Sequence, residues 1–223
     1  MKKIIILVFL AVSLISMAPF KKTHILFFGD SITQAGINPG GYITRIQHYL
    51  DSTGKASDFQ LTGAGIGGNK VYDLYLRLDT DVLAKKPDVV FIYVGVNDVW
   101  HKATSGTGTD IDKFEKFYVA LIKKMQAQNI QVIVCTPATI GERWDNSNQQ
   151  DGDLNAYSKV IRKVAAEMNC KLVDLRKEFI DYNTKNNPQN IDKGILTTDR
   201  VHLNDAGNQM VANQMMKVLG WVE

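Results

Sequence analysis

The sequence contains little of what builds disulfide scaffolds, metal centres or charged interaction surfaces. Only two cysteines, Cys135 and Cys170, occur in 223 residues, too few for a disulfide scaffold or a four-ligand zinc site. The four histidines lie too far apart to pair as metal ligands on one helix turn. Lys and Arg number 26 against 23 Asp and Glu, and this near balance lacks the basic excess of a nucleic-acid-binding protein. We therefore expect no metal site and no nucleic-acid partner.

The first 18 residues have the three-part layout of a secretory signal peptide. Two lysines precede an apolar run over residues 4–14, and small residues follow it up to Ala18. The run is short for a membrane-spanning helix, although a retained membrane anchor is the competing interpretation. We predict cleavage of residues 1–18, export to the periplasm or the medium, and no stable membrane span in the mature chain. Residues 19–223 would then form one domain.

Beyond residue 23, short apolar runs alternate with longer segments of helical period, as is typical of a parallel sheet covered by helices on both faces. The predicted strands are residues 24–28, 59–62, 88–94, 130–136 and 171–175. The predicted helices are residues 42–50, 71–78, 111–128, 154–168 and 205–219. No stretch rich in Pro, Ser or Gly separates two domains. The pattern predicts one doubly wound α/β layer with a five-stranded parallel sheet.

The two cysteines fall near the ends of two predicted strands. Cys135 lies late in the fourth strand, and Cys170 lies at the start of the fifth. We place these strands at opposite edges of the sheet, too far apart for a disulfide. Two free thiols are therefore expected, even in an oxidising compartment.

Polar, glycine-rich segments follow three of the predicted strands, at residues 29–32, 63–69 and 95–98. In an open parallel sheet, ligands bind at the carboxyl ends of the strands, where loops diverge and helix N-termini present N–H groups. Asp199 and His202 lie in the loop before the last predicted helix, three residues apart. One tight turn is enough to bring this carboxylate and imidazole together.

These segments supply the groups that acyl transfer needs. Ser31 would be the nucleophile, His202 would accept its proton, and Asp199 would orient the imidazole. Asn97 offers a side-chain amide donor, and Gly68 allows the backbone to approach a developing oxyanion. Each motif alone is typical of an ordinary turn or helix cap, so the catalytic hypothesis depends on their joint presence.

In this order, the four segments resemble the motifs of the SGNH hydrolases, also called the GDSL esterases and lipases, over residues 24–219. The resemblance implies a flavodoxin-like three-layer α/β/α sandwich and no cofactor. It also implies a catalytic triad of Ser31, His202 and Asp199. The oxyanion hole would consist of the Ser31 and Gly68 backbone N–H groups and the Asn97 amide.

Two positions depart from the family pattern. Gly63 stands where Asn is frequent, and Asn69 stands where Asp is common. Hydrogen bonding around the oxyanion loop is therefore expected to differ in detail from that of relatives.

The segment from Gly65 through Arg77 to Asp98 resembles the acetylhydrolase-like branch of the family. We predict a serine esterase acting on short acyl groups, such as acetyl esters on sugars or lipids. A lysophospholipase or thioesterase for longer chains is the main alternative. Trp100 and His101 directly follow Asp98 and are candidates to line the acyl or leaving-group pocket.

Two further classes remain as alternatives. Gly63, Gly65 and Gly68 also satisfy the spacing of a dinucleotide fingerprint, which would make the protein a nucleotide-binding flavodoxin-like module. An inactive carbohydrate-binding SGNH-like domain is the other. A nucleotide-binding module would leave Ser31, Asp199 and His202 unexplained. An inactive domain would have no need to retain these three residues together with Gly68 and Asn97. The polar insertion at residues 138–153 follows a strand end, and its role and the oligomeric state stay open.

Overall fold

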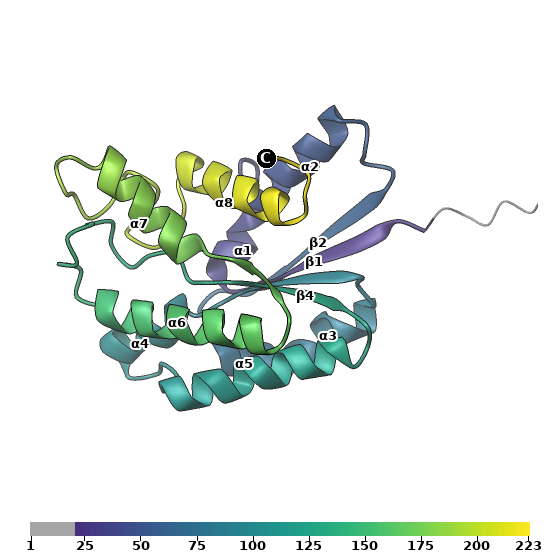
Figure 1. The fold of residues 1–223 in the computed structure, drawn as a ribbon, viewed down its shortest axis with the longest axis horizontal. Coiled ribbons are helices and arrows are strands. Elements are labelled where there is room, and N and C mark those ends of the chain that lie inside the picture. Colours follow the sequence, from purple (N-terminus) through teal and green to yellow (C-terminus); the bar gives the residue numbers. More distant parts are fainter. Residues whose placement is uncertain (1–20) are drawn as a thin grey trace, which may run out of the picture.

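Five parallel strands form the centre of the structure, a computed structural model that describes residues 21–223. In spatial order the strands are β2, β1, β3, β4 and β5 (Figure 1). Their bounds along the chain are β1 Thr23–Gly29, β2 Phe59–Gly65, β3 Val89–Tyr93, β4 Gln131–Cys135 and β5 Lys171–Val173. All five predicted strands are present, with ends that differ by at most three residues.

Helices cover both faces of this sheet, as Figure 1 shows. On one face lie α3 Val71–Asp81, α4 Val96–Ser105, α5 Ile111–Gln126 and α6 Asp151–Glu167. On the other lie α1 Ser31–Gly36, α2 Tyr42–Ser52, α7 Leu175–Asn186 and α8 Asp205–Val218. A short 3₁₀ turn, η1, spans Leu83–Lys85. The predicted three-layer α/β/α sandwich with a doubly wound parallel sheet is confirmed.

Three helices were not predicted from the sequence, for two different reasons. Helices α1 and α4 begin inside the glycine-rich segments that follow β1 and β3, where the sequence pattern indicates only a turn. Helix α7 buries Leu175 and Phe179 but is polar over most of its length, so its apolar positions do not form a helical stripe.

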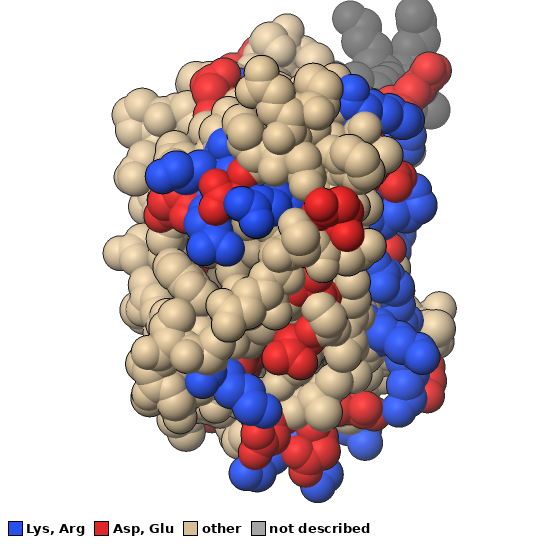
Figure 2. Space-filling view, turned by 90° about the vertical axis from the view of Figure 1, so that its left-hand side faces the viewer, with Lys and Arg blue, Asp and Glu red and all other residues tan. Residues whose placement is uncertain are grey.

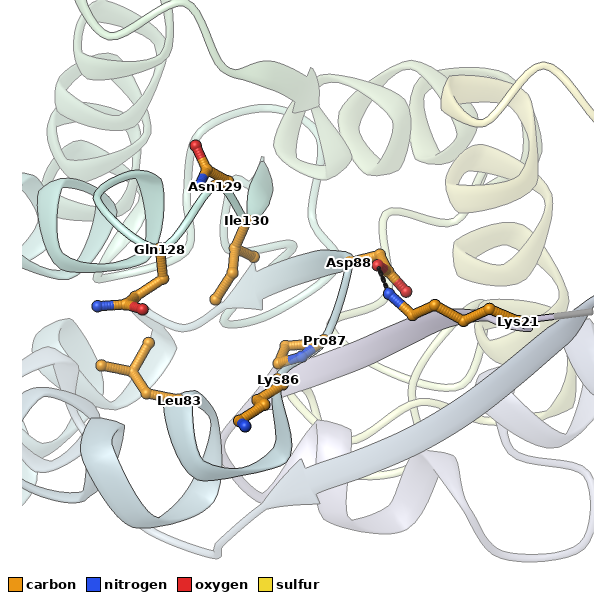
Figure 3. A pocket seen from close by; sticks show the side chains of 8 residues that line it. All are labelled: Lys21, Leu83, Lys86, Pro87, Asp88, Gln128, Asn129 and Ile130. Atoms are coloured by element: carbon orange, nitrogen blue, oxygen red, sulfur yellow. Dashed lines mark hydrogen bonds and ion pairs between the residues drawn. The ribbon is translucent and has the colours of Figure 1, made fainter. Parts of the chain in front are cut away.

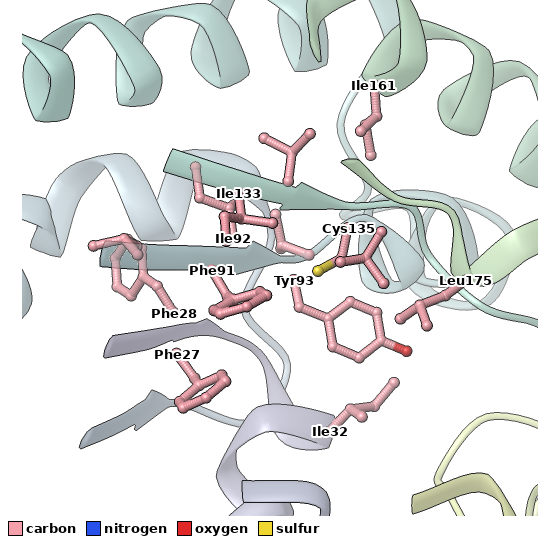
Figure 4. Packing of buried hydrophobic residues seen from close by; sticks show 14 of the residues in the cluster. Phe27, Phe28, Ile32, Phe91, Ile92, Tyr93, Ile133, Cys135, Ile161 and Leu175 are labelled. Carbon is pink, nitrogen blue, oxygen red and sulfur yellow. The ribbon is translucent and has the colours of Figure 1, made fainter. Parts of the chain in front are cut away.

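The central strands are buried on both faces, which explains their continuous apolar runs. Phe27 of β1 stacks on Phe91 of β3 with ring centroids 5.1 Å apart (Figure 4). Tyr42 of α2 meets Phe27 edge-on at 5.8 Å. Such close packing leaves the central strands little freedom to shift. The strand ends are therefore firm supports for side chains.

The predicted placement of the cysteines is wrong, although both are free thiols. Strands β4 and β5 are hydrogen-bonded neighbours and do not lie at opposite edges. Cys135 ends β4, whereas Cys170 precedes β5 at its amino end, so the two are offset along adjacent strands. Sequence alone gave no strand order, and β5 is the outermost strand on the β4 side.

The predicted signal peptide, residues 1–18, lies outside the described residues. Between residues 21 and 223, no helix combines the length and the apolar character needed to cross a membrane.

Candidate active site

Ser31 is the first residue of α1, directly after the end of β1. The Asp30 carboxylate accepts the Ile32 N–H at 3.0 Å and so caps the helix. The segment after β1 thus contains an ordinary helix cap, but this cap does not account for Ser31. The Ser31 Oγ lies 2.9 Å from His202 Nε2, across 171 positions in the chain.

Asp199 and His202 form the predicted tight turn in the loop before α8. Asp199 Oδ2 lies 2.7 Å from His202 Nδ1, and Oδ1 accepts the backbone N–H groups of His202 at 2.8 Å and Val201 at 3.1 Å. Arg200, between them, adopts a left-handed conformation with φ 88°, which is strained for a residue with a side chain. Partial burial favours protonation of Asp199, but its hydrogen bonds outweigh burial and hold its pKa below the usual range. The carboxylate is therefore charged where it meets the imidazole.

The loop after β2 passes over Ser31. A Cβ placed on Gly67 would lie 3.9 Å from the Ser31 Cβ, and the Gly67 N–H donates to Gln34 Oε1 at 2.8 Å. Gly68 has φ +75°, a conformation that favours glycine. Neither its N–H nor that of Ser31 donates to another group within residues 21–223. Both remain available to an oxyanion.

Asn97 lies in the first turn of α4, with 2% of its surface exposed. Its amide Nδ2 donates one hydrogen bond to the Asn69 carbonyl at 3.1 Å, which leaves the second amide proton free. The structure thus brings all five predicted residues, Ser31, Gly68, Asn97, Asp199 and His202, to the carboxyl edge of the sheet. A hydroxyl, an imidazole, a carboxylate and unpaired N–H donors are the set that acyl transfer uses.

Arg77 on α3 belongs to the segment that resembles the acetylhydrolase-like branch, but the sequence assigned no role to its side chain. Its guanidinium donates to the Gly29 carbonyl at 2.7 Å, to the Ala64 carbonyl at 3.1 Å and to Asn69 Oδ1 at 2.7 Å. It also lies 4.5 Å above the Phe28 ring. Arg77 therefore links the ends of β1 and β2 to the loop that contains Gly68. Asn69, unusual for the family, still provides the oxygen that this link needs.

Glu142, in the insertion before α6, supports the Asp199–His202 turn. It is 1% exposed, and its carboxylate accepts the N–H groups of Ile195 at 2.7 Å and Leu196 at 2.6 Å. The neighbouring Gly141 N–H donates to the Arg200 carbonyl at 2.8 Å. The first part of the insertion is thus packed against the turn. No sequence motif marks Glu142, because its partners are backbone groups more than 50 residues away.

Two buried carboxyls lie close to this edge. Burial raises the pKa of Asp30 to about 7, against a lowering by the hydrogen bond from Ile32, and raises that of Asp98 to about 6. Asp98 also accepts the Val71 N–H at 3.1 Å and so fixes the start of α3 against α4. Both groups position backbone rather than reach a substrate.

The structure distinguishes the two pocket candidates, Trp100 and His101. A Cβ on Gly68 would lie 3.8 Å from His101 Cε1, whereas Trp100 packs partly buried against the core. Burial, together with the nearby Lys70 charge, lowers the pKa of His101, so the ring is neutral at neutral pH. Lys70 itself donates to the Gly68 carbonyl at 2.9 Å. Of the two candidates, His101 is therefore the one that borders the loop containing Gly68.

A separate pocket, shown in Figure 3, lies at the opposite edge of the sheet. It lies where β3 and β4 begin and includes the 2.6 Å ion pair between Lys21 and Asp88. None of the candidate site residues lines it. Over residues 21–223, no cluster of three or more His, Cys, Asp or Glu side chains is arranged to hold a metal ion.

The face at the carboxyl edge of the sheet carries charges of both signs, intermingled, with broad uncharged areas between them (Figure 2). Such a surface has no strong field of one sign to attract a highly charged substrate.

Comparison with known proteins identifies the class to which this fold and site belong. Residues 27–210 match the model of the GDSL-like lipase/acylhydrolase family, so the chain belongs to that family and is a carboxylic ester hydrolase. A solved structure of an acetyl xylan esterase, AlAXEase, is 63% identical, with a TM-score of 0.87 over 88% of this chain and 99% of that one.

Two more distant relatives match most of the chain. An acetylxylan esterase of Geobacillus stearothermophilus is 29% identical over 89% of this chain and 95% of its own length. A lipoprotein of Bacillus subtilis, YqeF, is 25% identical over 84% of this chain and 85% of its own length.

Proposed function

We propose that the protein is an exported serine esterase that removes acetyl groups from acetylated xylan. The observation that carries the proposal is the hydrogen-bonded series Ser31–His202–Asp199, with links of 2.9 and 2.7 Å. The substrate is supported by two relatives described as acetylxylan esterases, one of them 63% identical. Export is supported by the signal-like layout of residues 1–18. It also fits the proposed substrate, because a polysaccharide is too large to enter the cell and has to be hydrolysed outside it.

In the acylation step, Ser31 Oγ attacks the carbonyl carbon of the acetyl ester while His202 Nε2 takes its proton. Asp199 holds the opposite ring nitrogen and stabilises the positive charge that forms on the imidazole. The carbonyl oxygen becomes an oxyanion. We assign its stabilisation to the N–H groups of Ser31 and Gly68 and to the free amide proton of Asn97.

The tetrahedral intermediate then collapses. The bond to the sugar oxygen breaks, His202 donates its proton to that oxygen, and the acetyl group remains on Ser31 as an ester. Water attacks this acetyl-enzyme with His202 again acting as the base, and acetate leaves as Ser31 regains its proton. No step requires a cofactor or an external redox partner.

The proposal is tested by measuring acetate release from acetylated xylan and from p-nitrophenyl acetate, with Ser31→Ala as the matched variant. We expect both activities in the wild type and neither in the variant. Full activity of the variant would disprove the mechanism. Wild-type activity on p-nitrophenyl acetate but not on acetylated xylan would agree with the mechanism and exclude acetylated xylan as the substrate.

A lysophospholipase or thioesterase with a preference for longer chains is the competing assignment. A series of p-nitrophenyl esters from acetyl to palmitoyl separates the two. We expect kcat/KM to fall steadily beyond the shortest chains, and a maximum above about eight carbons would favour the longer-chain enzyme.

A further inference from the structure

The insertion between β4 and α6 has a buried part and an exposed part. Residues 138–142 are buried, and Gly141 and Glu142 contact the Asp199–His202 turn, as described above. Residues 143–147 are exposed and form the tip of the insertion. The contacts of the buried part account for its packing, but they leave the exposed tip without a role.

Trp144 lies in this tip with 39% of its surface exposed. Its indole N–H donates to the Asn187 carbonyl at 2.9 Å, and its backbone N–H donates to Asn190 Oδ1 at 3.0 Å. Asn190 in turn donates to Asp145 Oδ2 at 2.7 Å. The indole is thus held in one orientation although much of it faces solvent.

The support beneath Trp144 is itself rigid. Asn187 is fully buried, and its side chain donates to the carbonyls of Glu142 at 3.0 Å and Ile191 at 2.7 Å. Asn187 Oδ1 accepts the Ile191 N–H at 2.9 Å. An exposed apolar ring on a fixed base loses little conformational entropy when a ligand covers it.

The chain also limits how far Trp144 lies from the catalytic turn. Trp144 is three positions after Gly141, so the two Cα atoms are at most about 11 Å apart. Gly141 is hydrogen-bonded to Arg200, which lies between Asp199 and His202. The Trp144 backbone therefore lies within about 11 Å of a residue that contacts the Asp199–His202 turn.

We propose that Trp144 is a sugar-binding platform, on which a pyranose ring of the polysaccharide stacks while an acetyl group on a nearby residue reaches Ser31. This inference rests on the proposed function. A sugar ring has an apolar face of C–H groups and a polar rim of hydroxyls. The flat indole can stack on the C–H face of the sugar. The exposed, charged side chains of Arg143 and Asp145, on either side of Trp144, can form hydrogen bonds with its hydroxyls.

The surroundings favour a sugar over an acyl chain. A long hydrocarbon needs a continuous apolar groove, whereas Trp144 is a single ring between polar side chains. Binding at a distance from the reacting ester can also contribute to catalysis, because it holds the ester in place for attack.

Two measurements test the platform. The first is binding of unacetylated xylotetraose to the Ser31→Ala protein, with and without Trp144→Ala. The second is the ratio of kcat/KM on acetylated xylo-oligosaccharides to that on p-nitrophenyl acetate. Trp144→Phe serves as the conservative variant, and Leu76→Ala removes another exposed apolar side chain, from the middle of α3.

We expect Trp144→Ala to weaken xylotetraose binding about five- to tenfold and to lower the activity ratio by a similar factor, mainly through KM. Trp144→Phe should retain most of both, and Leu76→Ala should change neither. Unchanged xylotetraose binding, or an equal loss on both esters, would overturn the platform. The platform would also be overturned if Trp144→Ala lowered kcat/KM on a lysophospholipid, measured as a further substrate, more than kcat/KM on the acetylated oligosaccharide.

The test separates the platform from the proposed function. Trp144-dependent binding of xylotetraose without hydrolysis of acetylated oligosaccharides would retain the platform and exclude the substrate assignment. Hydrolysis that does not depend on Trp144 would exclude only the platform.

Discussion

The two halves of the candidate site are built in different ways. Ser31, Gly68 and Asn97 come within four residues of the ends of β1, β2 and β3. Strands β1 and β3 are buried in the core, and β2 is the partly exposed edge strand that pairs with β1. Asp199 and His202 lie on a half-exposed loop, and much of their support comes from the insertion that contains Glu142. The proposed nucleophile and oxyanion donors thus depend on the sheet, whereas the proposed acid–base pair depends on contacts between loops.

This difference predicts how each half fails. A change at a strand end should affect catalysis by moving donors that the core otherwise fixes. A change in the insertion should affect the catalytic turn and the stability of the loops together, because the same hydrogen bonds serve both.

The largest effect is expected from His202→Ala, which removes the base shared by both steps. We expect kcat to fall by about four to six orders of magnitude, since members of a triad act as a unit. Circular dichroism and the melting temperature should be nearly unchanged, because the side chain is only partly buried. A loss of less than about tenfold on p-nitrophenyl acetate would mean that another group takes the Ser31 proton.

Arg77→Met tests the sheet half. The variant removes the guanidinium hydrogen bonds to the carbonyls of Gly29 and Ala64 and to the Asn69 side chain, together with the ion pair to Asp81. We expect kcat to fall about 10- to 100-fold with little change in KM, because the oxyanion donors are displaced by fractions of an ångström. Arg77→Lys should recover part of the rate. A change confined to KM would contradict a positioning role.

Glu142→Gln tests the loop half. An amide has one acceptor oxygen where the carboxylate uses two, so one buried N–H of Ile195 or Leu196 loses its partner. We expect a loss of about 1–3 kcal/mol in the free energy of unfolding and about a tenfold lower kcat. Glu115→Gln, which affects only the partly exposed ion pair between α5 and Lys163 of α6, is the control. A stability loss without any change in kcat would show that the catalytic turn does not depend on Glu142.

The comparison also explains what the sequence could and could not predict. Strand ends are local features, so the motifs around Ser31, Gly68 and Asn97 were recognisable before the fold was known. Glu142 was not recognisable, and the role of the Arg77 side chain was not, because each acts on backbone groups of segments distant in sequence, which no local pattern records. The placement of the cysteines failed for the same reason, since strand order is a property of the whole sheet.

The smallest effect concerns stability and pH, through Asp30. Its pKa is raised to about 7 in the folded protein, so the fold holds a proton that the unfolded chain has already released between about pH 4 and 7. The contribution of Asp30 to the free energy of unfolding therefore falls as pH rises from about 4 to about 7, and it falls no further above that range. Asn at this position keeps an oxygen for the Ile32 N–H but cannot ionise.

We expect Asp30→Asn to narrow the difference between the melting temperatures at pH 5 and pH 8 by about 5 °C. The exposed Asp153→Asn should leave that difference unchanged. An equal pH dependence in wild type and Asp30→Asn would show that Asp30 is ionised in the fold at pH 5.

The most direct test of the proposed mechanism is to identify the nucleophile by covalent labelling. The protein is treated with a fluorophosphonate, which reacts with activated serines, and the labelled peptide is identified by mass spectrometry. We predict a single label on Ser31, absent in Ser31→Ala and strongly reduced in His202→Ala. A label on another residue, or full labelling of Ser31 without His202, would contradict the proposed mechanism.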